Sequence, residues 1–319
     1  MRQLEQVLWE EGEYRYDDAF GFVPQIHGYL HEDGQIRPCV IVVPGGGYEG
    51  VAASEGEIVA LEFWEKGYQA FVCTYTTNPL KRTPLHMQPL KDLSRAVRWV
   101  RSHCQELCVN PGQVAICGFS AGGHLCGSLC VHFADVSEEN PRYAKASNRP
   151  DAAILSYPVI TSGIKTHGGS MENLLGRDAS AGELAYMSLE RQVTEQTPPC
   201  LLWHTETDDA VPVENSYLMA AACREKGVPY ALHIFSDGNH GLSLSNDRWV
   251  SNQYGEFYTT RQAQQVLEQI RGCGLTVSEE ELERIEGLAV MGVCPKEELV
   301  REEVAVWPLI AHQWLQKVM

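Results

Sequence analysis

The sequence predicts an α/β protein built on a mostly parallel, doubly wound sheet. Short apolar runs of strand length alternate with segments of helical periodicity. Residues capable of chemistry follow several of those runs, and a chain of 319 residues with 44% hydrophobic content can bury a large core. At this length one elaborated α/β domain is as plausible as two, and we expect a single domain over residues 1–319, with its site at the carboxyl ends of the strands.

The N-terminal half supplies the first strands and helices of this pattern. Ser54-Glu55-Gly56-Glu57 has the form of a capping box, which predicts a helix through Trp64 that ends at Gly67. The other predicted elements are edge strands within 13–30, strands at 38–43 and 68–75, and a helix marked by apolar residues from 90 to 100.

The C-terminal half repeats the alternation. It predicts strands at 114–117, 152–157, 200–203 and 230–235, shorter helices up to about residue 190, and helices at 260–269 and 279–285. Residues 246–303, which contain the predicted helices at 260–269 and 279–285, are polar and acidic. Such a composition is typical of a solvated surface segment.

The segment Gly118-Phe119-Ser120-Ala121-Gly122-Gly123 lies between a predicted strand and a predicted helix. Glycine on both sides of a serine permits a sharp turn that holds the hydroxyl clear of its neighbours. The Gly-x-Ser-x-Gly pattern alone is weak, because roughly one chain in ten of this size contains it by chance. Its partners must come from elsewhere in the chain.

Three further loops offer those partners. Pro44-Gly45-Gly46-Gly47-Tyr48 follows a predicted strand and presents backbone N–H groups. Asp208 and Asp209 follow the strand at 200–203, and His240 follows the strand at 230–235. A serine, a carboxylate and an imidazole at the ends of separate strands form the set that nucleophilic acyl transfer requires.

These blocks resemble the α/β-hydrolase-fold esterases of the group that includes feruloyl and acetyl-xylan esterases and bacterial lipase-like or xylanase-B-like proteins. The resemblance implies the α/β-hydrolase fold, with helices on both faces of the sheet. The pattern Asp-x-x-Val-Pro selects Asp208 over Asp209. The matching blocks are Pro44–Tyr48, Gly118–His124, Thr197–Thr205, Asp208–Pro212, Gly238–Gly241 and, as the last helix, Trp307–Leu315.

The roles follow from this chemistry. Ser120 is the expected nucleophile, His240 the general base and Asp208 the residue that orients His240. The N–H of Ala121 and one from Gly46 or Gly47 are the expected oxyanion hole.

Three other residues lie near the predicted site. Tyr48 either lines the substrate pocket or covers the sheet edge, and the sequence leaves both readings open. We expect His124 and His204 to serve in packing or hydrogen bonding. The mechanism requires no cofactor, so none is predicted.

The resemblance implies hydrolysis of short-chain acyl esters, with acetyl groups on plant-cell-wall sugars as one candidate substrate class. An amidase or peptidase with the same triad stays open, because the triad can also protonate an amine leaving group. A hydrolase fold kept as a non-catalytic binding module is the third interpretation.

Composition excludes several other classes. The net charge of −17 opposes binding to nucleic acid, and no apolar run approaches the length of a membrane span. The eleven cysteines are scattered without zinc-ligand spacing, which predicts reduced thiols and no metal site. The N-terminus shows no apolar signal region, so we expect a cytoplasmic protein, although export of a longer precursor stays open.

Related esterases are usually short between the histidine loop and the last helix, so residues 246–303 are expected to be a helical insertion in the fold. A solvated surface addition is the simplest interpretation. A sharper hypothesis is that the insertion borders the acyl pocket or forms a homodimer contact, since it departs a few residues after His240.

Overall fold

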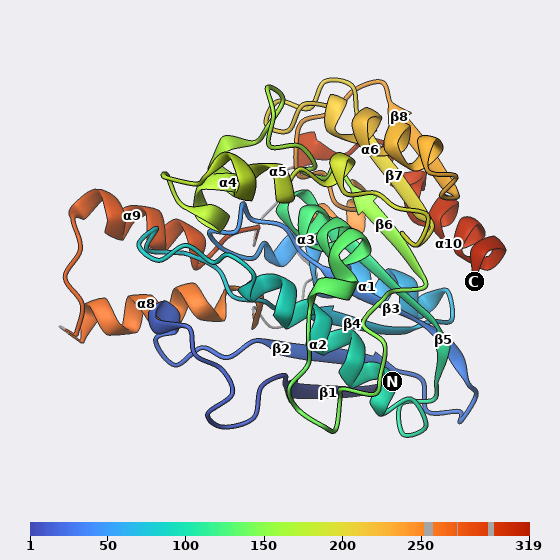
Figure 1. The fold of residues 1–319 in the computed structure, drawn as a ribbon, viewed down its shortest axis with the longest axis horizontal. Helices are drawn as coiled ribbons and strands as arrows, with labels where there is room; N and C mark the ends of the chain where they lie inside the picture. The colour runs from blue at the N-terminus through green and yellow to red at the C-terminus, as the bar shows by residue number, and fades with distance from the viewer. Residues whose placement is uncertain (252–257, 273, 293–296) are drawn as a thin grey trace.

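A computed structural model describes residues 1–319 except 252–257, 273 and 293–296. Its sheet has eight strands in the order β1-β2-β4-β3-β5-β6-β7-β8. β2 is antiparallel to both β1 and β4, and all other neighbours are parallel (Figure 1). The strands are β1 (Arg2–Val7), β2 (Gln25–Leu30), β3 (Arg37–Val43), β4 (Gln69–Cys73), β5 (Val109–Phe119), β6 (Ala152–Ser156), β7 (Cys200–Thr205) and β8 (Tyr230–Phe235).

The predicted fold class is confirmed, since helices cover both faces of this mostly parallel sheet. α2 (Gln88–Ser102), α3 (Ser120–His132) and α6 (Glu214–Glu225) contribute to one buried cluster, and α1 (Glu57–Glu65) and α10 (Trp307–Val318) contribute to the other. Strands covered on both faces carry continuous apolar runs, as β6 and β7 do.

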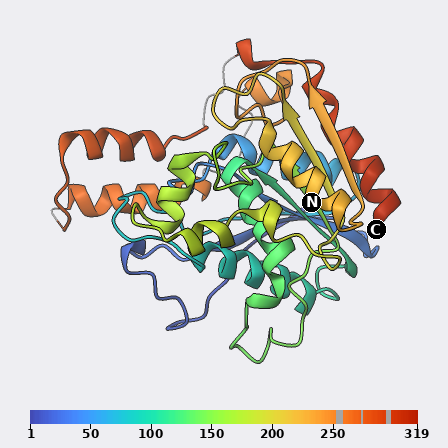
Figure 2. The same cartoon turned by 45° about the horizontal axis from the view of Figure 1, so that its top comes forward.

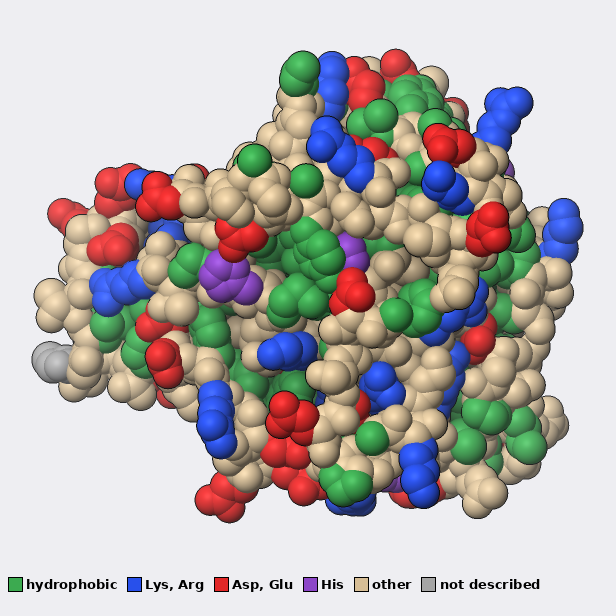
Figure 3. Space-filling view, in the orientation of Figure 1, with side chains coloured by type: hydrophobic (Ala, Val, Ile, Leu, Met, Phe, Trp, Pro, Cys, Tyr) green, Lys and Arg blue, Asp and Glu red, His purple; other side chains and the backbone are tan. Residues whose placement is uncertain are grey.

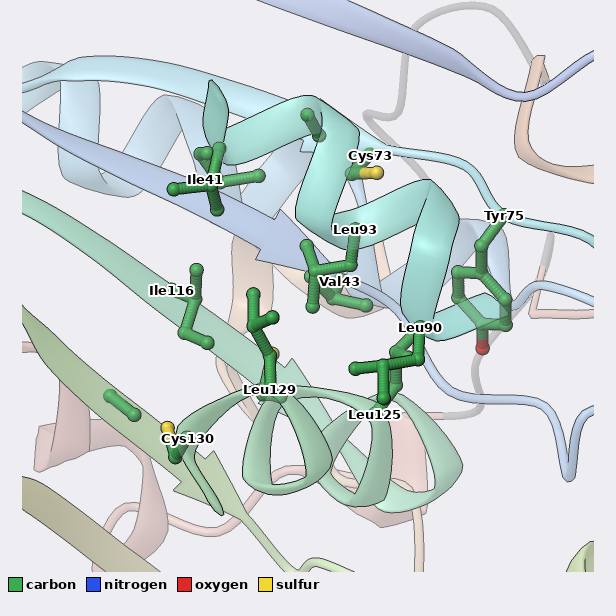
Figure 4. Close-up of a cluster of buried hydrophobic side chains, with 14 of the residues drawn as sticks. Ile41, Val43, Cys73, Tyr75, Leu90, Leu93, Ile116, Leu125, Leu129 and Cys130 are labelled. Carbon is green, nitrogen blue, oxygen red and sulfur yellow. The ribbon is translucent and has the colours of Figure 1, made fainter. Parts of the chain in front are cut away.

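The core on the α2 and α3 face holds the central strands in place. Figure 4 shows Leu93 of α2 and Leu129 of α3 packed toward Ile41 of β3 and Ile116 of β5. Each such aliphatic side chain contributes about 1.5–3 kcal/mol when fully buried. This packing fixes the strands whose carboxyl ends carry the candidate site.

The predicted edge strands within residues 13–30 are only partly correct. Residues 25–30 form β2, whereas 13–24 contain no strand, and Tyr14 and Tyr16 instead bond through their hydroxyls to Thr76 and the carbonyl of Thr83. β1 was not predicted, because its polar sequence RQLEQV pairs only along one edge and stays mostly exposed.

The predicted capping box at Ser54–Glu57 does not form. A short 3₁₀ helix occupies Ala53–Glu55, and α1 then begins at Glu57 without a side-chain cap. Tertiary bonds replace the local ones, because the Ser54 carbonyl accepts from Ser243 Oγ and Trp249 Nε1 while Glu55 turns into the interior.

Shorter helices follow β6, namely α4 (Gly168–Leu175) and α5 (Ala181–Tyr186). After β8 come α7 (Asp247–Val250), α8 (Arg261–Arg271) and α9 (Glu279–Leu288), the last two close to the predicted ranges 260–269 and 279–285. α8 and α9 lie side by side and project from the body of the molecule (Figures 1 and 2). They share a small apolar cluster with Leu80.

The surface shows no concentration of positive charge on the face in Figure 3, where acidic and basic side chains are interspersed. Within the described ranges, no helix combines the length and apolar character needed to cross a bilayer. The nine described cysteines are all free thiols.

Candidate active site

Ser120 stands at the junction of β5 and α3 in a left-handed conformation, with φ of 52°. Glycine is required at 118 and 122 because other backbone segments approach these two positions closely. A Cβ on Gly118 would lie 2.2 Å from the Gly122 carbonyl oxygen, and one on Gly122 would lie 2.2 Å from the Val43 carbonyl oxygen. The Gly-x-Ser-x-Gly sequence therefore produces a strained strand-to-helix turn that only glycine at both positions permits.

The structure brings Ser120, His240 and Asp208 into one hydrogen-bonded chain. Ser120 Oγ lies 2.8 Å from His240 Nε2, and His240 Nδ1 lies 2.8 Å from Asp208 Oδ2. The three residues come from the ends of β5, β8 and β7. The His240 side chain is 20% exposed, whereas that of Asp208 is 1% exposed. The imidazole thus connects a buried carboxylate to a hydroxyl at the surface of the site.

Asp208 is held as a charged acceptor. Its Oδ1 accepts from the backbone N–H of Ala210 and Val211 at 3.0 and 2.8 Å. Burial opposes the charge, but hydrogen bonds from His204 and His240 outweigh it and keep the pKa of Asp208 well below its usual range. A charged Asp208 favours the tautomer of His240 that carries hydrogen on Nδ1 and leaves Nε2 to accept the serine proton.

His204 forms a hydrogen bond with Asp208. Its Nε2 faces both Asp208 Oδ2, at 3.1 Å, and the Val211 carbonyl oxygen, at 3.0 Å, so this nitrogen carries the hydrogen. Its Nδ1 then accepts from Ser216 Oγ at 2.9 Å. This fully buried histidine has the hydrogen-bonding place that the sequence predicted.

Asp209 does not reach the imidazole ring. Its Oδ1 accepts from the backbone N–H of His240 at 2.9 Å, and its Oδ2 accepts from Asn239 Nδ2 at 3.1 Å. The exposed Asp209 thus shapes the histidine loop, while Asp208 faces the ring.

The backbone N–H groups of Ala121, Gly46 and Gly47 are the predicted oxyanion donors. Ala121 lies in the first turn of α3, where backbone N–H groups have no acceptor within the helix. Within the described residues, no protein group accepts from the N–H of Gly46 or Gly47. Asn173 Nδ2 donates to the Gly47 carbonyl at 2.9 Å and so fixes the Gly47–Tyr48 peptide next to these glycines. The action of these N–H groups on a negatively charged oxygen near Ser120 stays a prediction.

Tyr48 is buried, with 1% exposure, and its hydroxyl lies 2.8 Å from His124 Nδ1. His124 Nε2 donates to the Met187 carbonyl at 3.0 Å, and burial lowers the pKa of His124 to about 4. The neutral His124 therefore accepts from Tyr48 and anchors the Gly-rich loop to α3. Contact of Tyr48 with substrate stays a prediction.

Sequence reasoning missed two residues behind the site, Glu55 and Tyr157. Glu55 Oε2 accepts from the Gly45 N–H at 2.7 Å, and Tyr157 donates its hydroxyl to Glu55 Oε1 at 2.6 Å. The Tyr157 ring also lies edge-on to His240, with 5.0 Å between ring centroids. The available signal was a lone glutamate among small residues, Ala52-Ala53-Ser54-Glu55-Gly56, directly after the Gly-rich turn.

Comparison with known proteins finds relatives among esterases and xylanases. The BD-FAE family model matches residues 29–223. The chain is 48% identical over 262 residues to endo-1,4-beta-xylanase B of Butyrivibrio fibrisolvens, covering 82% of this chain and 41% of that protein. It is 31% identical over 211 residues to an acetylxylan esterase of Xylanibacter ruminicola, covering 64% of this chain and 41% of that protein. The chain thus spans about two fifths of the length of these curated relatives.

Solved structures give the same picture of the fold. An acetyl ester-xyloside bifunctional hydrolase from Caldicellulosiruptor lactoaceticus superposes with a TM-score of 0.72 at 36% identity, covering 85% of this chain and 96% of that chain. The carboxylesterase Cest-2923 from Lactobacillus plantarum superposes with a TM-score of 0.70 at 22% identity, covering 99% and 98%, which supports the fold.

Proposed function

Because the chain belongs to the BD-FAE family of α/β-hydrolase-fold esterases, we propose that it is a serine carboxylic ester hydrolase acting on short-chain acyl esters. The observation that carries this proposal is the continuous chain from Ser120 Oγ through His240 to Asp208, with distances of 2.8 Å at both links. A further support is that, among the described residues, no protein group accepts from the backbone N–H groups of Gly46 and Gly47.

In the proposed reaction, Ser120 Oγ attacks the ester carbonyl carbon while His240 Nε2 accepts the hydroxyl proton. Negative charge on the carbonyl oxygen is stabilised by the N–H of Ala121 and one N–H of the Gly-rich loop. His240 then gives its proton to the departing alkoxide, which leaves as an alcohol. Water, activated by His240, hydrolyses the acyl-enzyme and restores Ser120.

Acetylated carbohydrate is the proposed substrate class. Its support is the likeness to an acetylxylan esterase, to a xylanase B and to an acetyl ester-xyloside hydrolase. Fold alone carries little information about substrate, so the class must be measured.

The test compares wild type with Ser120→Ala on p-nitrophenyl acetate, butyrate and octanoate, on acetylated xylo-oligosaccharides and on an aminoacyl anilide. We expect acetyl esters to be the best substrates and Ser120→Ala to lose at least about 10³-fold in kcat. Faster anilide cleavage would indicate an amidase. A folded wild type that neither turns over esters nor reacts with a fluorophosphonate at Ser120 would indicate a binding module.

A further inference from the structure

We infer that Glu55 is a positioning residue that aligns the Gly-rich loop with the histidine loop. This inference rests on the proposed function, because alignment matters only if Gly46, Gly47 and His240 act on an ester at Ser120. Among the described residues, the hydrogen bonds of the Glu55 carboxyl do not include Ser120 or His240. Its carboxyl reaches both loops through Gly45 and Tyr157.

The Glu55 carboxyl and Ser120 lie on either side of Gly45. Glu55 is 4% exposed, and a Cβ placed on Gly45 would lie 2.9 Å from Glu55 Oε2 and 2.9 Å from Ser120 Cβ. Gly45 therefore occupies the space between the carboxyl and the serine. Its N–H donates to Glu55, which fixes the Pro44–Gly45 peptide, one peptide before the one that carries the Gly46 N–H.

The second oxygen of Glu55 connects to the histidine loop. Tyr157 donates to Glu55 Oε1 and accepts from the backbone N–H of Ser243 at 3.0 Å, three residues after His240. Ser243 Oγ also donates to the Ser54 carbonyl at 2.7 Å, which joins the histidine loop to the 3₁₀ helix that carries Glu55. One buried carboxyl thus fixes the relative position of the two loops.

The hydrogen-bond pattern favours the charged form of Glu55. Gly45 N–H can only donate, and the Tyr157 oxygen already accepts from Ser243, so its hydrogen is directed to Glu55. Both carboxyl oxygens then act as acceptors, which a carboxylate satisfies fully. Among the described residues, no lysine or arginine forms an ion pair with Glu55. Burial raises the pKa of Glu55, so this charge is held by the two donors at a cost in stability. Keeping such a group behind a catalytic loop indicates a role in alignment.

Glu55→Gln tests this role because the amide has only one acceptor oxygen and cannot serve both donors. We expect kcat on p-nitrophenyl acetate to fall by about 10- to 100-fold, less than the loss of an entire oxyanion donor, while KM changes less than about threefold. The inhibition constant of a boronic acid, whose tetrahedral adduct places an oxygen in the oxyanion hole, should rise by the same factor as kcat/KM falls.

Asp92→Asn is the matched control, since it makes the same carboxyl-to-amide change in an equally buried group. Asp92 is bonded to Trp9, Thr76 and Gln88 and to neither loop of the site. Its kcat and boronate affinity should stay within about threefold of wild type. Tyr157→Phe is the second variant, because it removes the hydroxyl that links Glu55 to Ser243 and should give a smaller loss in kcat with unchanged KM.

The inference is overturned if folded Glu55→Gln keeps wild-type kcat and boronate affinity, or if Asp92→Asn loses both equally. If Glu55→Gln does not fold, Tyr157→Phe decides by the same two readouts. Failure of the proposed function is separate, because it appears in wild type as an absence of esterase activity and of labelling at Ser120.

Discussion

At the scale of single residues, the two adjacent aspartates separate two roles within one loop. Asp208 faces the imidazole of His240, while Asp209 binds the backbone N–H of the same residue. Asp208→Asn should therefore lower kcat by about 10³- to 10⁴-fold, because an amide can donate to Nδ1 and favour the wrong tautomer. Asp209→Asn keeps an acceptor for the backbone N–H and should lose less than about tenfold. Steady-state kinetics on one acetyl ester measures both.

Equal losses from the two substitutions would contradict this division of roles. Circular dichroism of both variants serves as the control, since a loss of fold in either one would lower activity for another reason. Asp209 sits in exposed surroundings, so its variant should fold as wild type does.

The buried carboxyl of Asp92 should make the stability of the protein fall as pH rises. Burial raises its pKa to about 6, despite hydrogen bonds from Thr76, Gln88 and Trp9. In the unfolded chain this carboxyl loses its proton near pH 4, so rising pH between about 4 and 6 favours the unfolded state. The stability contributed by the protonated group is present at low pH and lost as pH rises through the folded pKa.

Asp92→Asn removes this titration. Urea unfolding at pH 4.5 and pH 7 should therefore show wild type losing more stability than the variant on going to pH 7. The difference has a ceiling of about 3 kcal/mol for a shift of this size. An unchanged gap between the two proteins at both pH values would show that Asp92 does not titrate in this range.

At the scale of elements, replacing glycine by alanine should have opposite effects in the turn between β5 and α3 and in α9. Gly122→Ala places a methyl group 2.2 Å from the Val43 carbonyl oxygen, so it should destabilise the protein by several kcal/mol or prevent folding. Gly287→Ala, within α9, meets no atom within 4 Å and should stabilise the protein by about 0.5–1 kcal/mol. Thermal or urea unfolding measures both, and a neutral Gly122→Ala would refute the packing described for this turn.

Elements with strong local patterns were predictable from the sequence, and elements defined by distant contacts were not. The apolar runs of β3, β5, β6 and β7, the alternation of β8 and the apolar periodicity of α2 identify those elements directly. β1 has no such pattern, because its six mostly polar residues depend on pairing with β2. Ser54–Glu57 has the local form of a capping box, but Glu55 binds Tyr157, which lies 102 positions away.

In the candidate site too, residues in local motifs were predictable and residues joined by distant contacts were not. Ser120, Asp208 and His240 were recognisable because each follows an apolar strand in a characteristic short motif. The choice between Asp208 and Asp209 needed the family pattern, since adjacent residues of one type look alike in a single sequence. Glu55 and Tyr157 are far apart in the sequence and meet only in the folded structure. No sequence motif therefore identifies them as a pair.

At the scale of the whole molecule, the projecting pair α8 and α9 is joined to the Gly-rich side of the site. Gln262 of α8 accepts from the Thr77 N–H at 2.9 Å, and Arg284 of α9 pairs with Glu49 and donates to the Pro79 carbonyl at 2.7 Å. Beyond α9, the Met291 carbonyl accepts from the Ala53 N–H at 2.9 Å. Through these bonds, residues within 246–303 can influence the position of the Gly-rich loop.

Arg284→Ala should therefore loosen residues 46–55, because Glu49 and the Pro79 carbonyl lose a shared donor at a half-buried position. We expect faster amide hydrogen exchange in that segment and a fall in kcat of about three- to tenfold, by misalignment of the Gly-rich loop. The matched control is Arg271→Ala, which removes only an exposed pair with Glu286 between α8 and α9. If both variants left exchange at 46–55 unchanged, α8 and α9 would be a surface addition without influence on catalysis, as their polar composition alone suggests.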